Sequence, residues 1–223
     1  MKRRILLSAA ALVTVALSLT IATAFGASGR LSLYLVNSGP DSNFYNVTDA
    51  NGSTCPSFSK PASLSATNTG TGVQYDSPGY AFDPGDQPSR FSYTVPAGGG
   101  FTVPASSDAV ILKLWAFSGN GTCRGQTGAQ AVDWRVYCTG TTCGSQVSLT
   151  GAGQLDKPGW QAVGVPAGTP TNTLFNNHAG PSSAVNVGAG DVITLELSAD
   201  TWAGIQWSAR NGAGVSSLSI LRT

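Results

Sequence analysis

Few residues of this chain have the chemistry of a catalyst. Sugar hydrolysis needs two carboxylic acids, and the alternation around Asp133 and Glu196 predicts that both point outward from strands, where they could face one cleft. Glu196 is the only glutamate and His178 the only histidine. There is no G-x-S-x-G motif, and zinc hydrolases need more than one histidine. We therefore expect no enzyme, with a glycoside hydrolase, or an accessory domain of one, as an alternative.

Aromatic and polar residues give a second chemistry, the binding of sugars, whose C–H faces pack on flat rings beside hydrogen-bonding groups. Strand alternation predicts that Trp134 and Trp207 belong to the core. The residues that remain as candidates for ligand contact are Trp115, Trp160, Trp202, Tyr80, Asn177 and His178. We expect His178 to be an exposed turn residue in a polar, glycine-containing segment. The aromatic candidates would equally serve to cap the ends of a β-sandwich.

Three carboxylates, Asp76, Asp83 and Asp86, lie in one loop rich in proline and glycine. Calcium takes six to eight oxygen ligands, many of them main-chain carbonyls. The segment does not match an EF-hand loop, and aspartate is also a common turn former. A plain turn and a calcium site both remain open, and the sequence indicates no other cofactor.

The four cysteines form an even set, which in an exported chain suggests two disulfides. Residues 139–142 read as a hairpin loop that would bring Cys138 opposite Cys143. The remaining pair would be Cys55 and Cys123. The C-x2-C spacing typical of zinc sites is absent, which disfavours a metal at these thiols.

The first 24 residues have the pattern of a secretory signal peptide. Three basic residues precede an apolar stretch from Ile5 to Ala24, and Ala22 and Ala24 fit a small-residue cleavage site. Cleavage after Ala27 is an alternative, as is a retained membrane anchor, and the two arginines are also consistent with twin-arginine export. We expect a secreted, extracellular protein with no membrane contact after cleavage.

Removing Lys2, Arg3 and Arg4 from the twelve basic residues leaves nine against eleven acidic ones, a net charge of −2. This balance disfavours nucleic acid and anionic membrane surfaces as partners. Charged residues make up only 10% of the chain, well below the usual quarter. Glycine, serine, threonine and asparagine replace the residues that helices favour. The composition favours short strands joined by turns.

Period-two alternation predicts about nine strands after residue 30. The clearest are 31–36, 91–95, 109–117, 132–138, 160–165, 192–199, 205–210 and 215–221. We expect one all-β domain over residues 25–223, an antiparallel β-sandwich or jelly roll, in which residues 37–88 form an irregular, loop-rich segment.

Residues 91–221 resemble the galactose-binding-domain-like jelly rolls of secreted bacterial proteins. The resemblance is carried by the apolar strand 110–115, the tryptophan-led strand 160–165, the Gly-Asp turn and strand at 187–195, and the closing strand 216–220. It implies a fold used for sugar binding, for accessory domains of hydrolases and for surface adhesion. Because such folds serve many purposes, the resemblance alone does not fix a function.

From these observations we predict a secreted, non-enzymatic binding module whose partner is a glycan or another cell-surface polymer. The alternative is a structural or assembly subunit of the cell surface, for which the high content of glycine, serine and threonine is suitable. The sequence does not specify the ligand or the oligomeric state.

Overall fold

A computed structural model describes the chain over eleven ranges: 29–37, 44–48, 54–58, 62–68, 89–118, 130–153, 158–165, 173–199, 205–208, 210–211 and 214–223. The predicted signal peptide lies outside these ranges and stays a prediction. No helix within them is long and apolar enough to cross a membrane.

The described residues form strands and no helices, which confirms the all-β prediction. The long strands are β1 (Gly29–Asn37), β5 (Ser89–Thr94), β7 (Val110–Ser118), β8 (Gln130–Gly140), β11 (Thr173–Ala179), β13 (Val192–Ala199) and β17 (Ser217–Arg222). The shorter ones are β2 (Phe44–Thr48), β3 (Thr54–Phe58), β4 (Ala62–Ser65), β6 (Phe101–Val103), β9 (Gly144–Ser148), β10 (Gln161–Val165), β12 (Val185–Val187), β14 (Ile205–Ser208), β15 (Arg210–Asn211) and β16 (Gly214–Val215).

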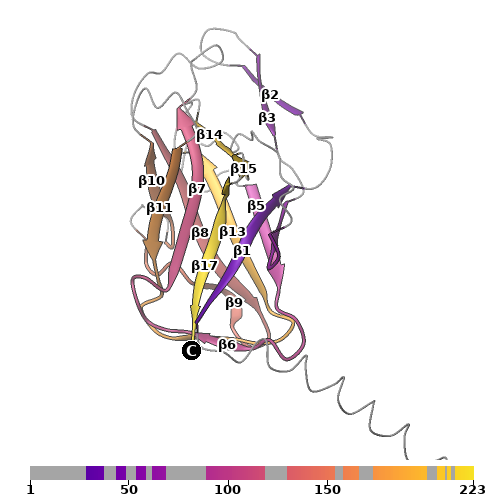
Figure 1. Ribbon diagram of the computed structural model, residues 1–223, viewed down its shortest axis with the longest axis vertical. Coiled ribbons are helices and arrows are strands. Elements are labelled where there is room, and N and C mark those ends of the chain that lie inside the picture. Colours follow the sequence, from indigo (N-terminus) through magenta and orange to yellow (C-terminus); the bar gives the residue numbers. More distant parts are fainter. Residues whose placement is uncertain are drawn as a thin grey trace, which may run out of the picture.

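Eleven strands make one curled sheet. Its order is β10-β8-β13-β5-β4-β1-β17-β7-β11, with β9 added beside β8 and β14 added beside β7. Figure 1 shows β7, β17 and β1 lying side by side along the molecule, with β8 and β13 behind them. The sheet therefore bends round so that its two halves face one another.

The core fills the space between these two halves. In β7, alternate residues point inward, and Val110, Leu112 and Leu114 are fully buried. The facing half contributes Trp134 and Leu195, which belong to the same apolar cluster. The prediction that Trp134 is a core residue is confirmed. Because strand side chains alternate between faces, the same pattern determines which residues of β7 lie on the outside.

The sheet is mixed, because β4 and β5 run parallel through the pairs Ala62–Phe91 and Ser63–Ser92. The expectation of a purely antiparallel sheet is therefore wrong at this point. The described ranges also hold seventeen strands instead of about nine. Three of the added strands are β6, β11 and β12, whose polar or very short sequences give little alternating signal.

The two end strands of the sheet, β10 and β11, come together at a seam. A side chain bridges them: Asn177 of β11 donates from Nδ2 to the carbonyl oxygen of Ala162 in β10, at 3.0 Å. The Oδ1 of the same amide accepts a hydrogen bond from Trp134 Nε1 at 3.1 Å. Asn177 thus joins both ends of the curled sheet to a core tryptophan.

Candidate functional site

The outer side of four neighbouring strands forms the candidate site. Strand β7 buries its inner residues and turns the alternate ones outward: Lys113 is exposed, and Ile111 and Trp115 are half-buried. We call this surface the β7 face. Its members are Ser32 and Tyr34 of β1; Ile111, Lys113 and Trp115 of β7; Leu174, Asn176 and His178 of β11; and Ser217 and Ser219 of β17.

Strand register places these side chains in ladders across the sheet. One ladder has Lys113 at its centre, with Asn176 of β11 on one side and Ser217, followed by Tyr34, on the other. Directly opposite partners in neighbouring strands lie close enough for their side chains to interact. The ladder therefore surrounds one cation with neutral hydrogen-bonding groups.

A second ladder of the β7 face is apolar. Trp115 lies opposite Leu174, which is 37% exposed and is the one large apolar side chain classed as exposed among the described residues. The Trp115 main-chain N–H donates to Ser216 Oγ at 3.1 Å, which fixes the strand at this point. Trp115, a candidate for ligand contact, thus lies half-buried on the same side of β7 as Lys113.

A third ladder ends in a charged corner. His178 lies opposite Ile111, and its Nδ1 is 2.9 Å from Asp108 Oδ1. Arg30 donates from Nη2 to the main-chain oxygen of Asp108 at 2.7 Å. The side chains of His178 and Asp108 are 48% and 66% exposed, so water competes for this contact and it contributes little stability. The prediction that His178 is a turn residue is wrong, since it lies within strand β11.

Two other candidates, Asn177 and Trp160, do not join the β7 face. Asn177 points inward and is occupied at the seam, as described above. Trp160 is only 1% exposed, and its ring lies 4.9 Å from the guanidinium carbon of Arg135. Trp160 is therefore not accessible for ligand contact. Gln161 lies opposite Trp134, which puts Trp160 beside Arg135 and under that long side chain.

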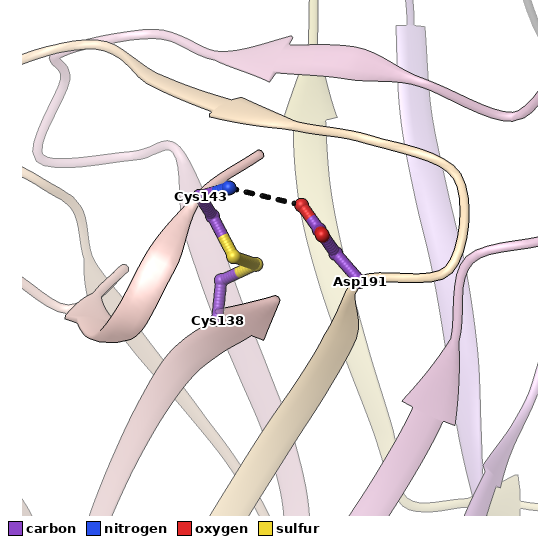
Figure 2. Close-up of side chains that lie close together, drawn as sticks. All are labelled: Cys138, Cys143 and Asp191. Atoms are coloured by element: carbon purple, nitrogen blue, oxygen red, sulfur yellow. Dashed lines mark hydrogen bonds between the residues drawn. A yellow bond between two sulfur atoms is a disulfide. The ribbon is translucent and has the colours of Figure 1, made fainter. Parts of the chain in front are cut away.

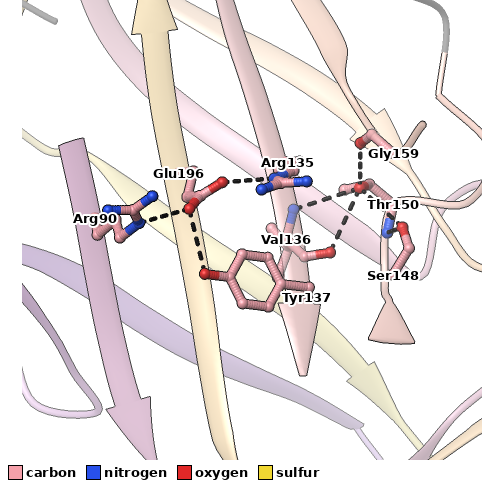
Figure 3. A network of polar contacts seen from close by, with 8 residues as sticks. All are labelled: Arg90, Arg135, Val136, Tyr137, Ser148, Thr150, Gly159 and Glu196. Carbon is pink, nitrogen blue, oxygen red and sulfur yellow. Dashed lines mark hydrogen bonds and ion pairs between the residues drawn. The ribbon is translucent and has the colours of Figure 1, made fainter. Parts of the chain in front are cut away.

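A polar network occupies the outer side of the other half of the sheet. We call it the Glu196 network; its members are Arg90, Arg135, Tyr137, Trp160 and Glu196. Glu196 Oε1 accepts from Arg90 Nε at 2.7 Å, and Oε2 accepts from Arg135 Nε at 2.5 Å. Tyr137 donates its hydroxyl to Oε1 at 3.2 Å. Figure 3 shows the carboxylate between the two guanidinium groups.

The prediction that Asp133 and Glu196 point outward and could face one cleft for sugar hydrolysis is wrong. Glu196 is 1% exposed and Asp133 is fully buried. Alternation correctly placed both away from the core face, but the outer side here is itself covered. Burial, followed by the charge of Glu196, raises the pKa of the Tyr137 hydroxyl above its usual value. The arrangement keeps both oxygens of the Glu196 carboxylate occupied by Arg90, Arg135 and Tyr137.

A buried threonine fixes the loop beside the network. Thr150 Oγ1 donates to the main-chain oxygen of Gly159 at 2.6 Å and accepts from the Val136 N–H at 3.3 Å (Figure 3). Ser148 Oγ donates to the Gly151 oxygen at 2.9 Å. These bonds hold the segment that leads into Trp160, which explains why that ring is buried.

Two of the four cysteines form a disulfide, as the hairpin sequence predicts. Cys138 and Cys143 are joined, with 6.1 Å between their Cα atoms. Asp191 lies next to them (Figure 2): its Oδ2 accepts from the N–H groups of Cys143 at 3.0 Å and of Gly188 at 2.9 Å. A Cβ at Gly140 would overlap the Asp191 carboxylate, so only glycine permits this approach.

The same Asp191 is a buried anion without a basic partner in this cluster. Burial raises the pKa of its carboxyl group, but N–H donors of Gly188, Thr142 and Cys143 outweigh burial and hold the pKa below its ordinary value of 3.8. The two sulfur atoms and this carboxylate are close enough to suit a metal ion. The disulfide removes the thiolates that a metal would need. The disulfide and Asp191 together stabilise the hairpin.

Several predicted residues fall outside the described part of the chain. These are Trp202, Tyr80, Asp76, Asp83, Asp86 and Cys123, together with the side chain of Cys55, whose main chain lies in β3. The calcium site and the second disulfide therefore stay predictions.

Sequence reasoning did not single out several members of the β7 face, such as Leu174, Asn176 and Ser217. Their signal was weak because β11 reads as a polar loop. Once Thr173–Ala179 is read as a strand, alternation alone places Leu174, Asn176 and His178 on one side.

No protein-family model and no curated protein matches this chain. Among solved structures, the chain is similar to two crystal structures of a CocE/NonD family hydrolase from Staphylococcus aureus, with TM-scores of 0.48 and 0.47. The sequence identity is 11% in both cases, and the match covers 89% of this chain and 37% of the hydrolase. This chain thus matches little more than a third of the length of the hydrolase.

Proposed function

We propose that this protein is a secreted, non-enzymatic binding module that holds cell-surface carbohydrate on its β7 face. The observation that carries the proposal is the placement of Trp115 and Leu174 in one ladder next to the polar ladder of Lys113, Asn176 and Ser217. An aromatic ring with hydrogen-bonding groups beside it suits a sugar, which has an apolar face and a rim of hydroxyls.

The scaffold supports this use. The face is built on four paired strands, so the main chain that carries its side chains is held by the sheet. Their inner neighbours, such as Leu33, Leu112 and Leu218, are fully buried. The outer side of a curled sheet is not a concave pocket of the kind that holds a small molecule, so it suits an extended polymer better.

Secretion and a jelly-roll fold belong to the same proposal. The signal-peptide pattern and the Cys138–Cys143 disulfide both suit an oxidising compartment. The curled sheet with an apolar interior is consistent with a jelly roll that has acquired one parallel pair. The hydrolase alternative relied on outward-pointing Asp133 and Glu196, and the burial of both carboxylates removes that support.

A glycan array with the mature protein tests the proposal. We expect binding to at least one surface polysaccharide, and we expect Trp115→Ala to weaken it about tenfold, because an aromatic anchor at the centre of a binding surface carries much of the affinity. Trp115→Phe keeps a ring and is the matched control. Unaltered secondary structure by circular dichroism shows that each variant is folded.

Failure of the proposal would take one of two forms. Either the folded protein binds no glycan, or Trp115→Ala binds as well as the original protein. Self-association at high concentration that Trp115→Ala abolishes, with no glycan bound, would instead support an assembly subunit. Analytical ultracentrifugation measures this.

A further inference from the structure

The charges of the described residues are distributed unequally. The structure describes the side chains of four carboxylates: Asp133, Asp191 and Glu196 are buried, and Asp108 is exposed. Of the cations, Arg90 and Arg135 are both paired with Glu196. Lys113 is exposed at the centre of the β7 face, and no described carboxylate lies within ion-pair distance of it.

The neighbours of Lys113 explain why its charge is available. Its cross-strand partners are Asn176 and Ser217, which are both neutral. The one exposed carboxylate, Asp108, lies at the end of the face and is in contact with His178. Arg30 donates to the main chain at the same residue. The carboxylate at the corner thus contacts His178, while no described carboxylate contacts the cation at the centre.

We infer that the ligand of the β7 face is an acidic polysaccharide that carries a carboxylate on its sugar rings; this inference rests on the proposed function. Lys113 would receive the carboxylate, with Asn176 Nδ2 and the Ser217 hydroxyl as neighbouring donors. Trp115 lies two residues further along the same strand, about 7 Å away. A carboxylate on Lys113 thus places an adjoining part of the polymer over the ring.

The test uses polymer pairs that differ only in charge. Polygalacturonate, alginate and hyaluronan are each compared with the esterified form, in which the carboxylate is neutral, by biolayer interferometry on the mature protein. We expect at least one acidic polymer to bind about fivefold more tightly than its ester, the upper end of the effect expected for an exposed ion pair. Added salt should reduce this preference, because Lys113 is exposed and screened.

Variants of Lys113 locate the effect. Lys113→Met keeps the length of the side chain without the charge and should bind acid and ester equally, whereas Lys113→Arg should retain the preference. Trp115→Ala should weaken binding to both forms. Arg222→Met removes a cation at the end of β17, opposite Gly29 and outside the β7 face, and should leave the preference unchanged.

The outcomes separate the two proposals. Equal affinity for acid and ester, with loss of both in Trp115→Ala, would overturn the acidic ligand and leave the carbohydrate module standing. An unchanged preference in Lys113→Met would overturn the role of the lysine. Binding only to sulfated polymers would contradict a carboxylate, and no binding to any polymer would contradict both proposals.

Discussion

The outer sides of the two halves of the curled sheet differ in how far their side chains are paired and buried. On the Glu196 network, charged side chains are paired with one another and Trp160 is buried beneath Arg135. On the β7 face, Trp115 is half-buried and Lys113 has neutral neighbours. The same residue types serve stability in one half and remain accessible in the other. The proposed binding surface is therefore distinguished by the accessibility and pairing of its residues more than by their types.

Replacing one tryptophan in each half should give the largest effects and tests directly whether the two halves differ. Trp160→Ala should lower the free energy of unfolding by about 3–5 kcal/mol because it empties a buried site. Trp115→Ala should lower it by about 1 kcal/mol and act mainly on binding. Urea denaturation measures both. Similar losses of stability in the two variants would show that the halves do not differ.

Glu196→Gln tests the network at its central residue. Removing the charge leaves two guanidinium groups without their anion, and we expect a loss of about 2–3 kcal/mol. The loss is below that of a fully buried pair because the Arg90 side chain is 61% exposed. Glycan affinity of the folded variant should not change, and a drop in affinity with normal stability would assign the network to the binding site instead.

Alternation along the strands identified much of this architecture in advance, but not the burial of the network. The patterns of residues 109–117 and 192–199 correctly separated core residues from outer ones. They could not show that Glu196 is covered, because Arg90 and Arg135 lie 106 and 61 residues away from it in sequence. Side chains from distant parts of the sequence cover this outer face, so no local sequence pattern can predict its burial.

The site was only partly predictable for a related reason. Trp115 and His178 were selected as candidates, and both lie on the β7 face. Asn177 was selected with them, but its inward position follows from β11 being a strand, which its polar sequence hid. The disulfide was predictable because only four residues separate its cysteines, whereas the contact of Asp191 with that hairpin joins distant segments.

Asp191 is a second buried carboxylate, but main-chain N–H groups hold it, whereas arginines hold Glu196. Asp191→Asn should cost about 1–2 kcal/mol at neutral pH, since an amide cannot accept all of these hydrogen bonds. The pKa of Asp191 is lowered in the folded state, so its contribution is complete above the ordinary value of 3.8 and declines as the pH falls through the folded value.

This pH dependence gives the measurement. Urea denaturation of both proteins between about pH 6 and pH 2 should show the original protein losing its advantage over the variant as the pH falls below about 4. A constant difference across this range would mean that folding does not shift the pKa of the Asp191 carboxyl group.

The smallest expected effect on stability comes from the β7 face. Lys113→Met should change the free energy of unfolding by less than about 0.5 kcal/mol, because the side chain is exposed and makes no ion pair with a described residue. Thermal unfolding followed by circular dichroism is sensitive enough to check this. A larger loss would mean that Lys113 supports the fold, and the face would then resemble the Glu196 network.

The pairing of β1 with β17 has a consequence for how the protein is made. These strands join Gly29 to Arg222 and Leu33 to Leu218 in the middle of the sheet. A ribosome produces β1 early, and its partner is synthesised nearly two hundred residues later. This part of the sheet cannot close before β17 has been synthesised, and such distant pairing slows folding. Slow closure fits the proposed secretion, because a chain that is still unstructured can be threaded through an export channel.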